Sequence, residues 1–91
     1  MSDEDKLQND VRKGLEAQAL LDNSLFKETL AYLEQSYIAA WKATGAPELW
    51  GKVQSLESVR DHLNTVIRDG RLADAQVAQL VQRRKRERKY A

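Results

Sequence analysis

The densest group of chemically active side chains in this 91-residue sequence lies close to its C-terminal end. Six cations fall within seven residues: Arg83, Arg84, Lys85, Arg86, Arg88 and Lys89. Guanidinium and ammonium groups bind phosphate and carboxylate oxygens, so we expect this segment to engage an anionic partner. Six cations neutralise up to about six phosphates of a nucleic acid, which makes binding steeply salt-dependent. The ring of Tyr90 adds one surface for base stacking.

The charges of this basic tail, residues 82–91, allow three interpretations. Its partner is DNA, or it is an acidic protein surface, or the cations are solvated and only complement the dipole at a helix C-terminus. The acidic surface could belong to a neighbouring copy, because residues 1–10 carry four carboxylates against Lys6, a net charge of −3. The formal net charge of +1 therefore conceals a strong polarity along the chain.

Three aromatic residues, Tyr37, Trp41 and Trp50, flank a Gly- and Pro-containing segment that favours a turn. Trp and Tyr dominate the hot spots of protein interfaces, so one interpretation is a partner-binding anchor. The other is a small core in which the two indoles seal the end of a helical hairpin.

Catalytic and metal chemistry find little support in the sequence. His62 is the only histidine, and there is no cysteine. The adjacent Asp61 points to a different side of a helix, so it does not form a pair with the imidazole. We predict a non-enzymatic protein with no metal, no cofactor and no small-molecule substrate.

The periodicity of apolar residues predicts four helices that must position these groups. The first, 5–21, places Leu7, Val11, Leu15 and Leu20/Leu21 near one face, with Gly14 as a weak point. The second, about 24–43, has a heptad seam formed by Phe26, Leu30, Leu33, Tyr37 and Ala40, with Trp41 beside it.

The third helix, about 47–69, repeats Leu49, Val53, Leu56, Val59, Leu63 and Val66/Ile67. Asp69–Gly70 is expected to end it. A short fourth helix, with Leu72, Val77, Leu80 and Val81 as its apolar side, then runs into the basic tail.

The breaks between these helices favour an antiparallel hairpin of the second and third helices. Asp22, Asn23 and Ser24 are N-cap candidates, Gly45 can adopt a positive φ after a helix end, and Pro47 suits a first helical turn. The fold class is therefore all-α, with residues 1–81 as one domain and 82–91 as the tail. Two helices give a thin core, so the first helix or a second copy must cover it. We expect a homo-oligomer.

Membrane insertion and secretion are not expected. No apolar stretch approaches the roughly 20 residues that span a bilayer. The start, Met1 to Asp5, is acidic where a secretory signal is basic and then apolar.

Six short segments within about residues 20–73 resemble a family of small helical proteins encoded among the head and packaging genes of tailed bacteriophages and prophages. The matching segments are Leu20–Phe26, Leu30–Glu34 with Tyr37–Thr44, and Leu49–Trp50 with Val59–Leu63 and Ile67–Ala73. The connection between the two hairpin helices is shorter here than is usual in that family. The resemblance implies a viral setting, in the host cytoplasm or in the virion, and a role in particle assembly or DNA packaging.

Two hypotheses about function follow. The first is a phage-type assembly or packaging protein that oligomerises through its helical hairpin, while its basic tail binds DNA or an acidic capsid, portal or terminase surface. The second is a small nucleic-acid-binding regulator or an inhibitor of a host factor. The expected helices of about 20 residues are longer than those of helix-turn-helix readers, so any DNA binding should tolerate many sequences.

Overall fold

The computed structural model describes residues 3–90, and it describes side chains up to Glu87. These residues form three helices and no strand: α1 (Asp3–Asp22), α2 (Ser24–Thr44) and α3 (Pro47–Tyr90). The all-α prediction is confirmed.

Local side-chain and backbone chemistry sets the ends of α2. Of the three N-cap candidates, Asn23 has the role, because its Oδ1 accepts a hydrogen bond from the Phe26 amide at 2.9 Å. Gly45 ends the helix in the left-handed conformation, with φ of 68°, and its amide donates to the Trp41 carbonyl. A residue with a Cβ is strained in this conformation, which explains glycine at the position. Pro47 then opens α3 as its first residue.

The predicted helix end at Asp69–Gly70 is wrong. The third and fourth predicted helices form one continuous helix, α3, which extends through the basic tail to Tyr90. A glycine inside a helix costs only about 1 kcal/mol relative to alanine, and a glycine that ends a helix commonly does so by adopting a positive φ itself. Gly45 is the one glycine with a positive φ among the described residues. The 44 residues of α3 span about 66 Å at 1.5 Å per residue.

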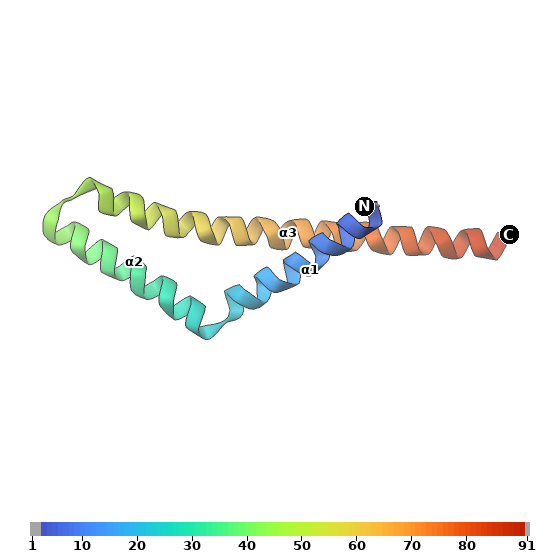
Figure 1. Ribbon diagram of the computed structural model, residues 1–91, viewed down its shortest axis with the longest axis horizontal. Helices are drawn as coiled ribbons and strands as arrows, with labels where there is room; N and C mark the ends of the chain where they lie inside the picture. Colours follow the sequence, from blue (N-terminus) through green and yellow to red (C-terminus); the bar gives the residue numbers. More distant parts are fainter. Residues whose placement is uncertain (1–2, 91) are drawn as a thin grey trace.

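The molecule is a long rod with two shorter helices on one side (Figure 1). From the turn at one end, α2 runs back at an angle to α3. The chain bends at Asn23, and α1 continues from there toward α3 and crosses it in its C-terminal half. The radius of gyration is 20.1 Å, whereas a compact chain of this length has about 12 Å.

Two glycines allow α1 and α3 to cross with their backbones in contact. A methyl group on Gly70 would lie 2.9 Å from the Cα of Gly14 and 3.0 Å from the Asp10 carbonyl oxygen. A methyl group on Gly14 would lie 3.0 Å from the Cα of Gly70. These distances are too short for a Cβ, so the crossing requires both glycines.

The packing face of α1 is only partly the predicted one, since Leu7, Val11 and Leu21 are half-buried as expected. Gly14 and Ala17 are buried, whereas Leu15 and Leu20 are exposed. Helices that approach this closely have room only for small side chains at the contact itself, so Leu15 lies beside it and lines a hollow with Ile67 and Gly70 of α3.

Beyond the crossing, the apolar side predicted for the fourth helix is also only partly right. Ala73 is buried and Val77 and Leu80 are half-buried, but Leu72 and Val81 are exposed.

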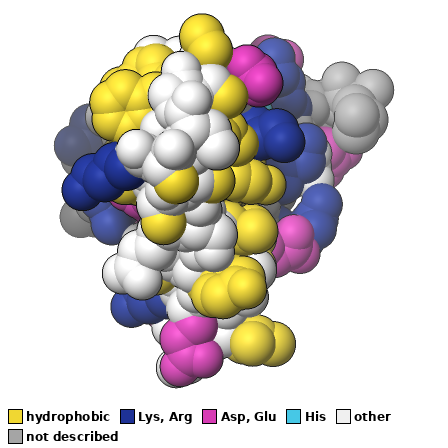
Figure 2. All heavy atoms as spheres, turned by 90° about the vertical axis from the view of Figure 1, so that its left-hand side faces the viewer, with side chains coloured by type: hydrophobic (Ala, Val, Ile, Leu, Met, Phe, Trp, Pro, Cys, Tyr) yellow, Lys and Arg dark blue, Asp and Glu magenta, His cyan; other side chains and the backbone are white. Residues whose placement is uncertain are grey.

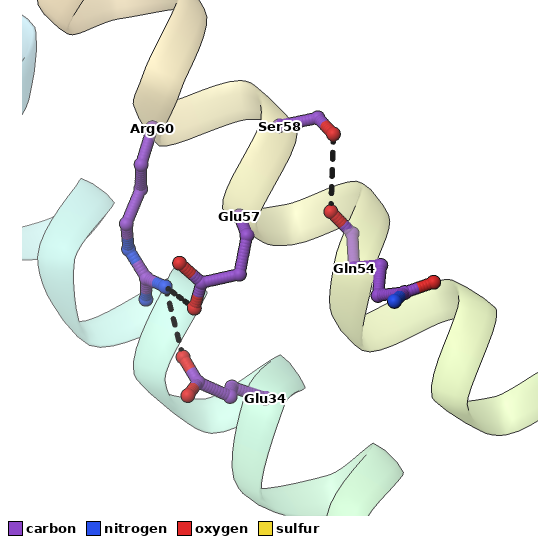
Figure 3. Close-up of polar contacts among 5 residues, drawn as sticks. All are labelled: Glu34, Gln54, Glu57, Ser58 and Arg60. Atoms are coloured by element: carbon purple, nitrogen blue, oxygen red, sulfur yellow. Dashed lines mark hydrogen bonds and ion pairs between the residues drawn. The ribbon is translucent and has the colours of Figure 1, made fainter.

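The α2 seam lies on the less exposed side of the helix, as its spacing predicts, with Leu30 buried at its centre. The matching seam of α3 contains one error. Val59 is exposed, and Arg60 takes the half-buried position beside it. The Arg60 guanidinium pairs with Glu34 on α2 at 2.9 Å and with Glu57 on α3 at 3.0 Å (Figure 3). An arginine can occupy this position because its aliphatic stem packs while its head reaches carboxylates and water.

The resulting core is small. The buried apolar side chains among the described residues are Ala17, Leu30, Val53, Ile67 and Ala73. The molecule exposes 7160 Å² of surface, whereas a compact monomer of 10.4 kDa exposes about 5,400 Å². Among the residues described, no helix is both long enough and apolar enough to span a membrane.

The crossing predicts opposite effects for two Gly→Ala substitutions in α3. Gly70→Ala should lower the free energy of unfolding by roughly 1–2 kcal/mol, because the new Cβ meets backbone atoms that cannot move aside. Gly51→Ala is the control, since nothing lies within 4 Å of its Cβ, and it should raise stability by up to about 1 kcal/mol. Urea unfolding at one protein concentration measures both. Equal stabilisation by the two substitutions would contradict the close crossing.

Candidate functional site

The basic tail is helical where the structure describes it. The side chains of Arg83, Arg84, Lys85 and Arg86 are all exposed on the last turns of α3. Successive residues of a helix point about 100° apart, so four consecutive cations place positive charge on every side of the rod. The side chains of Arg88 and Lys89, and the Tyr90 ring, lie outside the described residues.

One of these cations has a partner within the same chain. The Arg84 guanidinium donates to the Glu4 carboxylate, which lies in the first turn of α1. This hydrogen bond, and then the charge of Glu4, raise the pKa of Arg84 above its ordinary value, so Arg84 remains a cation. The structure therefore brings the two oppositely charged ends of the chain together, with α1 lying on the basic half of α3 (Figure 1).

The start of the basic tail and the helical turn before it form a polar hollow. Gln79, Gln82, Arg83 and Arg86 line a depression of about 280 Å³. Residues spaced by three, four and seven positions share one face of a helix, which brings two amides and two guanidinium groups together. Such donors suit the oxygens of a phosphate or a carboxylate.

The opposite end of the molecule carries the aromatic residues. The rings of Trp41 and Trp50 have centroids 5.8 Å apart and are tilted by 41°. With Gly45 and Pro47 they line a hollow of about 310 Å³ at the α2–α3 turn. Tyr37 lies further back along α2, with the Lys52 ammonium 5.5 Å from its ring centre. Figure 2 faces this end and shows hydrophobic side chains reaching the surface beside charged ones.

The exposed fractions of the two tryptophans fit neither a fully buried core nor a fully exposed anchor. Trp41 and Trp50 are 38% and 48% exposed, so each ring contacts the other and also contacts solvent. The pair thus covers the turn without forming a closed core. An interface anchor needs this kind of accessible aromatic surface.

The described residues add nothing to a catalytic or metal-binding interpretation. His62 is exposed on α3. Within residues 3–90, as far as side chains are described, no three His, Cys, Asp or Glu residues gather into a possible metal site. The prediction of a non-enzymatic protein stays a prediction.

Reasoning from the sequence missed two features of the site. It did not pair Arg84 with Glu4 of the same chain, although the opposite charges of the two ends were a signal for such a contact. It also treated Gly14 only as a weak point in a helix and Gly70 as a helix end, although their contact places the N-terminal turn of α1 beside the basic tail.

Comparison of the chain with protein-family models, with curated proteins and with solved structures found no match in any of the three.

The partial exposure of the tryptophan pair predicts a modest role in stability. Trp50→Ala should lower the free energy of unfolding by about 1 kcal/mol, because much of the ring is already in water. Leu30→Ala is the comparison, since Leu30 is 8% exposed, and it should cost about 2–4 kcal/mol. Urea unfolding followed by circular dichroism measures both. If Trp50→Ala costs as much as Leu30→Ala, the indoles are a sealing core and not an accessible anchor.

Proposed function

We propose that this chain is a non-enzymatic interaction protein that binds DNA through the basic tail of α3 and self-associates through the α2–α3 hairpin. The observation that carries the DNA-binding part is the helical continuation of α3 beyond α1 (Figure 1). Exposed cations lie on every side of this continuation. A rigid cationic rod presents its charges without first ordering a flexible segment, which lowers the entropic cost of binding.

The composition of the tail favours DNA over an acidic protein surface. The exposed residues 82–87 are Gln, Arg, Arg, Lys, Arg and Glu, with no apolar side chain among them. Tight protein interfaces rely on apolar or aromatic anchors, whereas a nucleic acid is bound largely through its phosphates. A single helix is also about as wide as the major groove of B-DNA, about 12 Å.

The biological setting that we propose is the assembly of a tailed-phage particle or the packaging of its DNA, in the host cytoplasm or in the virion. Support for this setting comes from the resemblance of residues 20–73 to small phage helical proteins. Binding through phosphates fits a packaging role, because a packaged genome presents every sequence and the protein must tolerate all of them.

Removing the two arginine charges that line the polar hollow tests DNA binding. The double variant Arg83→Gln/Arg86→Gln should bind random-sequence duplex at least about 10-fold more weakly at 100 mM salt. Its log–log salt slope should be shallower by about one unit for each cation removed. Fluorescence anisotropy at about 50 and 200 mM salt measures both quantities.

A matched control separates a local effect from a change in net charge. Arg68→Gln/Arg71→Gln removes the same two charges from exposed positions near the α1 crossing, and it should leave the salt slope nearly unchanged. No DNA binding by the wild-type chain would overturn the proposal and direct the basic tail to an acidic protein surface. Equal losses in both double variants would show that the tail has no special role.

The Glu4–Arg84 pair predicts a variant that gains affinity. Glu4→Gln frees Arg84 for a phosphate and removes one negative charge from beside the tail, so DNA affinity should rise by about 3- to 10-fold. Glu16→Gln is the control, because it breaks an exposed pair with Arg12 on the same helix, away from the tail. The same anisotropy titration measures both variants. Unchanged affinity in Glu4→Gln would mean that Glu4 does not compete with phosphate for Arg84.

A further inference from the structure

Besides its seam toward α3, helix α2 carries a second row of residues with heptad spacing. Its members share three properties. They are exposed, they are uncharged, and they repeat the four–three spacing of the α2 seam one residue earlier in the sequence. They are Leu25, Thr29, Tyr32, Ser36, Ala39 and Ala43. Leu25 and Tyr32 are each 71% exposed, the highest values among the large apolar side chains described. We call this row the outer α2 face.

The outer α2 face has no cover in the part of the chain that the structure describes, and α2 lies along one edge of the molecule (Figure 1). A helix that has only one apolar face to bury keeps charged residues elsewhere on its surface. Here both rows lack charges, and Lys27, Glu28, Glu34 and Lys42 are the charged residues of the whole helix. This pattern is typical of a helix that packs on two sides.

We propose that the outer α2 face is a homodimer interface in which α2 packs antiparallel against α2 of a second copy. This inference rests on the self-association part of the proposed function, to which it assigns a specific surface and orientation. It does not depend on DNA binding.

The size of the exposed surface supports a second copy as the occupant. The chain exposes 7160 Å², an excess of roughly 1,800 Å² over a compact monomer of its mass. A stable interface of standard size buries about 800 Å² on each partner. Burying about 800 Å² on each copy would therefore use less than half of this excess surface.

The sizes of the side chains support the antiparallel orientation. In an antiparallel pair centred on residue 34, Leu25 of one copy lies opposite Ala43 of the other, and Tyr32 lies opposite Ser36. Each large residue thus meets a small one, as close packing of two helices requires. A parallel pair would place Tyr32 against Tyr32 and Ala43 against Ala43, leaving one layer crowded and another underfilled.

The charges beside the face agree with this orientation. Glu28, Gln35 and Lys42 form one flank of the outer α2 face, spaced seven residues apart, and all three are exposed. In an antiparallel pair the same flank of both copies comes together. Glu28 of one copy then lies beside Lys42 of the other at each end, with the two Gln35 side chains meeting at the centre.

The orientation has a consequence for DNA binding. Because α3 runs back along α2, two antiparallel α2 helices direct the two α3 helices in opposite directions (Figure 1). The two basic tails of a dimer then lie at opposite ends of the assembly. Such a dimer can hold two separate DNA segments, or two sites on one DNA molecule, by bivalent attachment.

Sedimentation velocity of the full chain, over about a hundredfold range of protein concentration, tests the interface. The wild-type chain should be a dimer that dissociates on dilution. Tyr32→Glu should raise the dissociation constant by about 100-fold or more, because the two-fold symmetry places the buried charge in the interface twice. Leu15→Glu is the matched control, since Leu15 is 68% exposed on α1, and this variant should remain a dimer.

Single cysteines test the orientation, because the chain has no cysteine of its own. Gln35→Cys should be joined to its counterpart by a short bismaleimide crosslinker. Ala43→Cys should not, because the two substituted positions would lie about 27 Å apart along the helices. Efficient crosslinking of Ala43→Cys would overturn the antiparallel arrangement.

The outcomes for self-association and for DNA binding are distinguishable. A wild-type chain that stays monomeric at every concentration overturns the dimer. A dimer that is dissociated by Leu15→Glu but not by Tyr32→Glu overturns the proposed interface. Arg83→Gln/Arg86→Gln should remain a dimer, so loss of DNA binding in that variant leaves this inference intact. A dimeric wild-type chain that fails to bind DNA refutes only the DNA-binding part of the proposed function.

Discussion

The contact between Gly14 and Gly70 is the constraint on which the arrangement of this molecule depends. At this point two helices meet backbone to backbone, at distances that leave no room for a Cβ on either residue. Each glycine inside a helix is unfavourable by about 1 kcal/mol, so the packing at the crossing must stabilise the fold by more than the two glycines cost. From this point α1 runs along the C-terminal half of α3, which places its acidic first turn against the basic tail.

The same crossing explains why so much apolar surface remains outside. Small residues occupy the closest contact of α1 with α3, and Leu15 and Leu20 remain largely exposed. On the other side of the molecule, α2 and α3 diverge from their turn, and a half-buried arginine replaces an apolar residue at one position of their seam. A single chain in this shape covers only a few side chains, and its remaining apolar residues are available to partners.

The elongated shape also separates the candidate sites in space. The tryptophan pair lies at the turn, the basic tail at the far end of α3, and the outer α2 face along one edge (Figure 1). Contacts at one of these surfaces therefore leave the others accessible. Within one chain, the acidic turn of α1 occupies part of the basic tail, so a polyanion that binds there must compete with Glu4 for Arg84.

The sequence by itself determined the helical class, both ends of α2, the buried seam of α2 and the opposite charges of the two termini. Those features depend on neighbours along the chain: the Asn23 cap, the positive φ of Gly45, and apolar residues repeated every three or four positions. Only the tertiary structure decided that Gly70 continues a helix, that Gly14 packs where Leu15 was expected, and that Arg60 replaces Val59 in the seam. The physical reason is the relative size of the local and tertiary free energies. A local preference of about 1 kcal/mol for ending a helix at a glycine is outweighed when that glycine lets two segments distant in sequence come into close contact.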